Sequence, residues 1–340
     1  MRAALVALAA GVLVACSTGS QPPPPPPALG SPIVFGQVFT GNSTAATIPY
    51  AKFIWSDNGH LAIPGVPAGQ YTMAYRLASV SLAWLQANHP DWLILVNGAP
   101  VYQFGDTRYP VVDITNPAVV AFKQAEILAA HRTEAWLSID NVDTHQTPGQ
   151  VDPDWTAHNL AYIKAMATWG HGNGYKVMVN DTAGSTAVIP ADEEAVALAV
   201  DGVLVEGFPQ DACYTDASYT NGEPRGAQFD RMYGELVAEG AKEPTFLASY
   251  SCADAPTGTE ITWTLAVYLL LLPASEPAYV ALTSEAKSSY PADYAGLSWA
   301  LGAPLEPPPP ATGSRPYVRH YQGGLVTLDA LTGAATVSIY

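Results

Sequence analysis

Short apolar runs and longer amphipathic stretches alternate along most of this chain. Eight of the apolar runs have the length of strands: 33–39, 71–77, 92–96, 136–139, 176–179, 202–205, 245–249 and 279–282. Apolar runs this short, bounded by polar or turn residues, are typical of strands buried on both faces, as in a parallel sheet. The pattern therefore predicts strands whose two sides are both covered.

Helical spacing of apolar residues fills the segments between these runs. The clearest helix begins with Asn116, a good N-cap residue, and Pro117 in the first turn. We predict helices at 81–87, 116–131, 154–169, 192–200, 225–239 and 260–272. Eight strands interleaved with helices over about 250 residues predict an α/β fold, the (β/α)8 or TIM barrel. A doubly wound open sheet is the alternative, but no glycine-rich phosphate loop follows any strand.

The two ends of the chain lie outside this pattern. Residues 1–15 combine one basic residue with an apolar run, as a signal peptide does. Residues 16–32 contain six consecutive prolines, which predict a semi-rigid polyproline spacer. After a second proline cluster, residues 305–340 predict a β-hairpin and one further strand. We expect this segment to pack as a small β appendage on the barrel at 33–304.

The apolar run at the N-terminus ends on Leu13-Val-Ala-Cys16. This ending resembles the bacterial lipobox, and the resemblance implies that Cys16 is acylated and becomes the mature N-terminus. The protein would then be exported and lipid-anchored in the cell envelope. Because Ser17 follows the cysteine, the outer membrane is the expected location in a Gram-negative organism. An ordinary cleaved signal peptide is the alternative.

Composition narrows the choice of partner. Without Arg2, which precedes Cys16, the chain carries 13 basic and 30 acidic residues, a net charge of −17. Such a surface disfavours nucleic acid and anionic polymers. Eight Trp and 18 Tyr suit flat, weakly charged ligands such as sugars, although secreted folds are often aromatic-rich. We expect a monomer that acts on a polysaccharide or oligosaccharide and needs no cofactor.

Three successive predicted strands end on carboxylates: Asp140, Asp181 and Glu206. One such acid is as often a helix cap as a functional group. In a (β/α)8 barrel, however, the carboxyl ends of the strands meet at one mouth, so all three should converge. Glycoside hydrolysis needs one carboxylic acid to protonate the leaving oxygen and one carboxylate as nucleophile or base. Further residues near strand ends are expected to stack on or hydrogen-bond a sugar: Tyr75, Arg76, Trp92, Tyr214 and Tyr250. The aromatic residues among them are more commonly found in the core.

Four short motifs follow one another along the chain: His89-Pro-Asp-Trp92, Asp113-Ile-Thr-Asn-Pro117, Ser138-Ile-Asp-Asn-Val-Asp143 and Leu204-Val-Glu-Gly-Phe208. Together with the segment 317–326 they resemble TIM-barrel glycoside hydrolases, in the glycosidase-like families related to endo-α-1,4-galactosaminidases. The resemblance implies that Asp140 is the nucleophile and Glu206 the acid/base. Asp143 and Asp181 would then hold sugar hydroxyls or tune Asp140. A carboxylate separation of about 5–5.5 Å would imply retention, and about 6.5–9.5 Å inversion.

Besides Cys16, the chain contains Cys213 and Cys252. Each follows the carboxyl end of a predicted strand, and the two strands are neighbours. In an exported protein we expect them to form a disulfide that holds the loop after Glu206. Two free thiols are the alternative.

Two other functions stay open at this point. A carbohydrate-binding lipoprotein on a TIM-barrel scaffold would keep the aromatic residues but lack acids placed for catalysis. A metal-dependent hydrolase, such as a polysaccharide deacetylase, would need a His/Asp cluster, and the histidines show no zinc-ligand spacing. We therefore predict no metal site. The chain also lacks the Gly-x-Ser-x-Gly elbow of an α/β-hydrolase.

Overall fold

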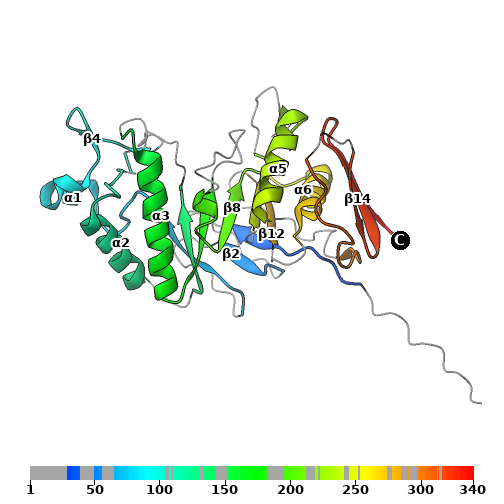
Figure 1. Cartoon of the computed structure of the whole chain (residues 1–340), viewed down its shortest axis with the longest axis horizontal. Helices are drawn as coiled ribbons and strands as arrows, with labels where there is room; N and C mark the ends of the chain where they lie inside the picture. Colours follow the sequence, from blue (N-terminus) through cyan, green and yellow to red (C-terminus); the bar gives the residue numbers. More distant parts are fainter. Residues whose placement is uncertain are drawn as a thin grey trace, which may run out of the picture.

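The computed structural model describes residues 29–38, 50–55, 65–103, 107–108, 110–130, 134–142, 152–181, 195–211, 219–220, 223–240, 245–251, 253–273, 278–284, 290, 298–311, 313 and 316–340. These residues form a mixed α/β fold, with helices beside a central sheet and a small β-sheet at the C-terminal end (Figure 1).

The central sheet has six parallel strands in the order β12-β11-β8-β7-β6-β3. In chain order these strands are β3 (Gly69–Met73), β6 (Trp136–Asp140), β7 (Lys176–Asp181), β8 (Gly202–Glu206), β11 (Thr245–Ser251) and β12 (Ala278–Ser284). Neighbours in the sheet are consecutive in this order, as expected when helices connect parallel strands. The predicted parallel α/β architecture is confirmed.

A second, two-stranded parallel sheet pairs β1 (Gly36–Val38) with β2 (Phe53–Trp55). It touches both edges of the six-stranded sheet. On one side Phe35 forms a parallel bridge with Val280 of β12, and on the other Ile54 bridges Ala68, just before β3. The backbone hydrogen bond from Ile54 N to Pro67 O measures 3.0 Å. The sequence pattern missed β2, because three residues are too few to show a period.

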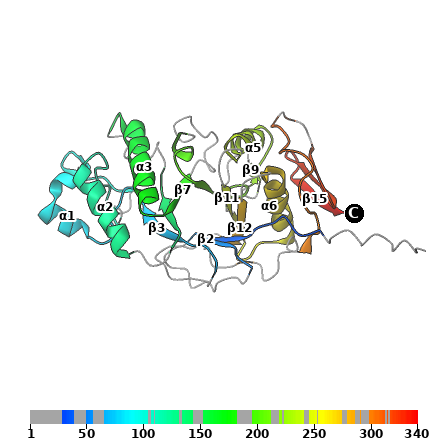
Figure 2. The same cartoon turned by 60° about the horizontal axis from the view of Figure 1, so that its bottom comes forward.

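The helices lie close to the predicted positions: α1 (Leu82–Asn88), α2 (Pro117–Ala130), α3 (Trp155–Gly172), α5 (Ala227–Gly240) and α6 (Gly258–Leu271). Figure 2 shows α3 beside β7, which it contacts. The predicted cap of α2 is present, since Asn116 Oδ1 accepts a 2.9 Å hydrogen bond from Ala118 N. Thr257 and Glu260 form a capping box at the start of α6.

In β6, β7, β8, β11 and β12, alternate residues enter two different apolar clusters. Leu137, Val177 and Val203 join the cluster between strands and helices, together with residues of α3, α5 and α6. Their sequence neighbours Trp136, Met178 and Leu204 join a second cluster, the inner cluster. Its members come from seven strands: Val38, Phe53, Trp55, Trp136, Met178, Leu204, Phe246, Ala248, Tyr250 and Ala281. The strands are therefore buried on both faces, as their uninterrupted apolar runs predict.

The predicted strand at 92–96 is wrong. The chain instead forms a 3-10 turn, Pro90–Trp92, and then a hairpin of β4 (Leu95–Val96) and β5 (Ala99–Pro100) outside the central sheet. Its two-residue turn, Asn97-Gly98, has positive φ angles of 51° and 79°, the conformation that such tight hairpins favour. Leu95 and Val96 are exposed, so this apolar run does not mark a buried strand.

An antiparallel sheet of β13 (Tyr317–Tyr321), β14 (Gly324–Asp329) and β15 (Ala334–Ile339) forms the predicted β appendage. Arg319 of β13 connects this sheet to α6 through hydrogen bonds. Its buried guanidinium donates to the carbonyl oxygens of Leu269, Leu270 and Leu272 at the end of that helix. Cys16 and the predicted signal peptide lie outside the described residues. Within the described part of the chain, no helix is both long and apolar enough to cross a membrane.

Candidate active site

Three side chains meet at the carboxyl ends of three neighbouring strands. Asp140 ends β6, Asn180 lies one residue before the end of β7, and Glu206 ends β8. Each continues the inward-facing alternation of its strand, two or four residues after a member of the inner cluster. Asp140 and Glu206 are half-buried, while Asn180 is 1% exposed.

One amide group joins the two carboxylates. Asn180 Nδ2 donates to Asp140 Oδ1 at 2.7 Å and to Glu206 Oε2 at 2.6 Å. Because both oxygens lie within hydrogen-bond distance of the same nitrogen, they are about 5 Å apart or closer. The two acids that the sequence singled out therefore face each other across a single side chain.

Asp140 is surrounded by donors. Tyr71 Oη donates to its Oδ2 at 2.6 Å, and Asn141 donates from its backbone N to Oδ1 at 2.9 Å and from Nδ2 to Oδ2 at 3.2 Å. Asn141 has a left-handed φ of 58°, which turns the chain just after β6. With Asn180, the described contacts bring four donor atoms to this carboxylate, and such donors stabilise its negative charge.

Glu206 contacts Asn180 with one carboxylate oxygen and Tyr250, a residue of the inner apolar cluster, with the other. Tyr250 Oη donates to Glu206 Oε1 at 2.8 Å. Tyr250 belongs to the inner apolar cluster, and burial raises its pKa well above the usual value, an effect that the negative charge of Glu206 reinforces. The phenol therefore keeps its proton and stays a donor. Glu206 thus lies between the amide of Asn180 and a protonated phenol of the inner apolar cluster.

Hydrogen bonds connect the loop after Glu206 to β11 and α6. Gly207 N donates to Ala248 O at 2.8 Å, and Tyr250 N donates to Gln210 O at 2.9 Å. Gln210 Nε2 also donates to Glu260 Oε1 at 2.7 Å. Burial opposes ionisation of Glu260, but hydrogen bonds led by the backbone N–H of Thr257 hold its pKa below the usual value. These contacts fix the position of the strand end that carries Glu206.

Two predicted substrate contacts need correction. Tyr75 is 1% exposed and packs edge-on against Trp155, with ring centroids 4.8 Å apart. Trp92 is 6% exposed and stacks on His89 in a separate apolar cluster with Leu85. Both rings are covered by core side chains, so the structure assigns them to packing. Arg76 is half-buried, with its Nη1 3.9 Å from Met73 Sδ.

Other predicted residues cannot be placed beside the carboxylates. Asp181 is the last residue of β7, and its side chain lies outside the described part of the structure. The same is true of the whole of Asp143, Tyr214, Cys213 and Cys252, so the disulfide stays a prediction. Within the described residues, no group of three or more His, Cys, Asp or Glu side chains is arranged to hold a metal ion.

Three residues of the site were not predicted from the sequence: Tyr71, Asn141 and Asn180. The signal for Asn180 was the period of two in β7: Met178 faces the inner cluster, so Asn180 faces inward too. No local pattern marks Tyr71, because its contact with Asp140 depends on the pairing of β3 with β6.

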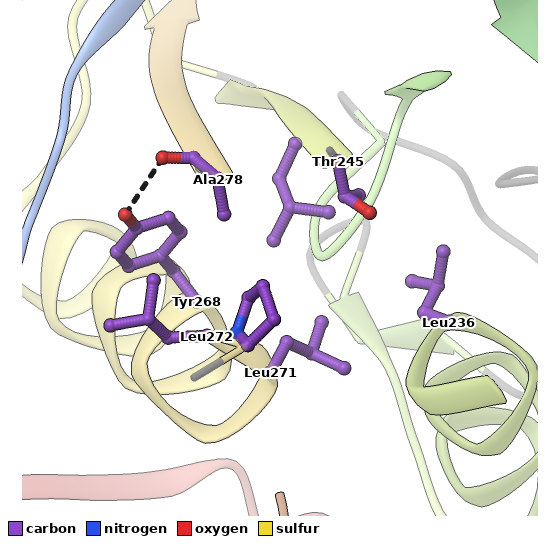
Figure 3. A pocket seen from close by; sticks show the side chains of 8 residues that line it. Leu236, Thr245, Tyr268, Leu271, Leu272 and Ala278 are labelled. Atoms are coloured by element: carbon purple, nitrogen blue, oxygen red, sulfur yellow. Dashed lines mark hydrogen bonds between the residues drawn. The ribbon is translucent and has the colours of Figure 1, made fainter. Parts of the chain in front are cut away.

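A small apolar hollow lies at the opposite end of the strands (Figure 3). Thr245 and Ala278, the first residues of β11 and β12, line it together with side chains of α5 and α6. Tyr268 Oη donates to Ala278 O at 3.0 Å at its edge. Its volume of about 10 Å³ holds at most one water molecule, so it is a packing defect and no binding site.

No family model and no curated protein matches this sequence. Among solved structures, the glycoside hydrolase domain of PelA from Pseudomonas aeruginosa is similar over 77% of this chain and 100% of its own, with 15% identity and a TM-score of 0.47. Ega3 from Aspergillus fumigatus, solved with galactosamine, is similar over 78% of this chain and 95% of its own, with 12% identity and a TM-score of 0.44. The α-N-acetylgalactosaminidase NagBb from Bifidobacterium bifidum is similar over 80% of this chain and 42% of its own, with 9% identity and a TM-score of 0.44. Likeness this remote assigns no activity to the chain.

Proposed function

We propose that this protein is a retaining glycoside hydrolase in which Asp140 is the nucleophile and Glu206 the acid/base. The observation that carries the proposal is the single amide of Asn180 bonded to both carboxylates. It keeps the two facing oxygens about 5 Å apart or closer, which favours the short carboxyl separation of retaining enzymes, about 5–5.5 Å, over the about 6.5–9.5 Å of inverting enzymes.

The reaction then has two steps. In the first, Asp140 attacks the anomeric carbon while protonated Glu206 gives its proton to the leaving oxygen, so that a glycosyl ester forms and the glycosidic bond breaks. In the second, Glu206 removes a proton from water, and the water oxygen displaces Asp140 from the anomeric carbon. Sugar leaves with the configuration it had, and both acids return to their starting states.

The unequal surroundings of the two acids support these roles. Four described donors stabilise Asp140 as the carboxylate that a nucleophile must be. Glu206 lies beside the inner apolar cluster, to which its partner Tyr250 belongs. Environments that separate two carboxyl groups in this way assign one as acid and the other as nucleophile.

The proposal includes the architecture around the site. The bridges from Phe35 to Val280 and from Ile54 to Ala68 support closure of the eight parallel strands into a (β/α)8 barrel. An inner cluster with members from β1, β2, β6, β7, β8, β11 and β12 also fits a filled barrel interior. We further propose that the enzyme acts on a polysaccharide at the cell surface, anchored by lipid at Cys16, with Cys213 and Cys252 bonded beside the site.

Paired variants test the chemistry. Asp140→Asn and Glu206→Gln should each fold normally and lose about 10³-fold or more in kcat on a polysaccharide, measured as reducing sugar over a panel that includes amino-sugar polymers. On an aryl glycoside whose leaving group needs no proton, Glu206→Gln should keep its first step, and added azide should speed its second. Asp140→Asn should gain from neither.

Two results would overturn the proposal. Full activity in Asp140→Asn would remove this residue from the reaction. A wild-type protein that binds a polysaccharide from the panel but releases no sugar would favour the non-catalytic carbohydrate-binding alternative instead.

A further inference from the structure

Asn180 combines full burial with incomplete hydrogen bonding. Both hydrogens of its Nδ2 are taken up by Asp140 and Glu206, while its Oδ1 is buried and has no hydrogen-bond partner among the described residues. The opposite orientation of the amide would direct its oxygen at the negatively charged Asp140, which can only accept hydrogen bonds, so this neighbour fixes the orientation. A buried carbonyl without a partner is unfavourable for folding.

The Asn180 amide stabilises negative charge on both Asp140 and Glu206. Two carboxylates this close repel each other, and the repulsion favours protonation of one of them. An NH2 group between them offers the positive end of a dipole to both at once. A side chain chosen for stability alone would satisfy its own oxygen, whereas this one places both hydrogens and leaves its oxygen without a partner among the described residues.

We propose that Asn180 is a positioning residue that sets the spacing of Asp140 and Glu206 and couples their protonation states. The proposal rests on the proposed glycosidase function and adds to it a residue that acts through both acids. When Asp140 becomes a neutral ester in the first step, the amide keeps one charged acceptor, Glu206. It thereby stabilises Glu206 as the carboxylate that must act as base in the second step.

The groups that face Asp140 and Glu206 predict that removing Asn180 affects the protonation of the two acids unequally. Tyr71 of β3 faces Asp140, and Tyr250 of β11, with Tyr290 beside it, faces Glu206. Without the amide, Asp140 keeps its contacts with Tyr71 and Asn141, whereas Glu206 is left against Tyr250 of the inner apolar cluster. Removing Asn180 should therefore change the protonation of Glu206 more than that of Asp140.

Asn180→Ala tests this, with Asn159→Ala as the matched control. Asn159 is also a fully buried asparagine whose Oδ1 has no described partner, but its Nδ2 donates to a backbone oxygen, that of Val142, at 2.8 Å. The first readout is 13C NMR titration of the side-chain carboxyl groups without substrate. The second is the pH profile of kcat/KM.

In Asn180→Ala, the titration of Glu206 and the alkaline limb of the profile should move to higher pH by about one pH unit. The titration of Asp140 and the acidic limb should move less. In Asn159→Ala, stability should fall while neither limb moves. Asn180→Ser supplies one hydroxyl donor in place of two N–H groups, so it should restore the position of only one limb.

Unchanged titrations in Asn180→Ala would overturn the coupling, whatever happens to the rate. If Asn180→Ala does not fold, Asn180→Ser decides, and wild-type positions of both limbs in that variant would equally overturn it. The NMR titration needs no turnover. A wild-type protein without glycosidase activity would therefore contradict the proposed function and still leave the coupling open to measurement.

Discussion

The two ends of the inner strand face are built from opposite kinds of side chain. At the amino end, aromatic rings fill the space: Phe53 lies 5.5 Å from Trp136, 5.8 Å from Phe246 and 5.0 Å from Tyr279, measured between ring centroids. At the carboxyl end, β6 and β8 bring together the carboxylates of Asp140 and Glu206. β6 takes part at both ends, with Trp136 as its first residue and Asp140 as its last, so the difference between the ends comes from the side chains.

The amino end of the inner strand face contributes mainly to stability, whereas the carboxyl end carries the groups proposed for the reaction. The aromatic end contains large apolar surfaces in contact, which favours folding. The carboxyl end places two acids close together and leaves Asn180 Oδ1 without a described partner, which disfavours folding. A fold that concentrates packing at one end tolerates such an arrangement at the other. Substitutions at the two ends should accordingly have different consequences.

The largest expected effect on stability is at the amino end. Phe246 is fully buried, and Phe246→Ala should lower the free energy of unfolding by about 3–5 kcal/mol, because it removes apolar contacts and leaves a cavity. Denaturant unfolding measures the change, and kcat per folded molecule should stay at the wild-type value. Phe246→Leu is the milder control. A large fall in kcat with unchanged stability would contradict the division between the two ends.

At the carboxyl end, Tyr71→Phe should affect the rate instead. The change removes the hydroxyl that donates to Asp140 Oδ2 at 2.6 Å. Since a hydrogen bond to a charged group contributes about 1.5–3 kcal/mol, kcat should fall about 10- to 100-fold. The melting temperature should change little, because the ring remains. A loss of stability as large as that of Phe246→Ala, without a loss of kcat, would contradict the assignment of stability to the amino end and activity to the carboxyl end.

The smallest effect compares one tyrosine from each end at alkaline pH. Burial raises the pKa of both Tyr250 and Tyr279 above the usual value of 10. Above about pH 10 the unfolded chain therefore loses these protons first, and stability falls by about 1.4 kcal/mol per pH unit for each tyrosine until the folded group titrates. Below that pH neither residue adds a slope.

Tyr250→Phe and Tyr279→Phe should each make the alkaline fall in stability less steep, as followed by denaturant unfolding between pH 9 and 11 (about one unit on either side of the unperturbed value). Only Tyr250→Phe should also lower kcat, because it removes a donor from Glu206. Equal losses of activity in the two variants would show that the aromatic end also takes part in the chemistry.

The sequence determined the local elements and the two acids. Apolar runs that stop on Asp140 and Glu206 predicted the ends of β6 and β8, and helical spacing with a cap at Asn116 predicted α2. These features depend on neighbours along the chain, so periodicity and capping chemistry reveal them. The same reasoning failed at 92–96, where a two-residue turn converts an apolar run into an exposed hairpin.

Tertiary structure alone decided which side chains meet. The sequence offered Asp181 at the end of β7, but the described site contains Asn180, because the inward face of that strand is set by the residues that enter the inner cluster. It offered Tyr75 and Trp92 as substrate contacts, but core side chains bury both, with Trp155 against Tyr75 and Phe122 against Trp92. Tyr71 reaches Asp140 only because β3 pairs with β6 across 69 residues of sequence. Contacts of this kind depend on strand register and on the closing of long loops, which no local pattern encodes.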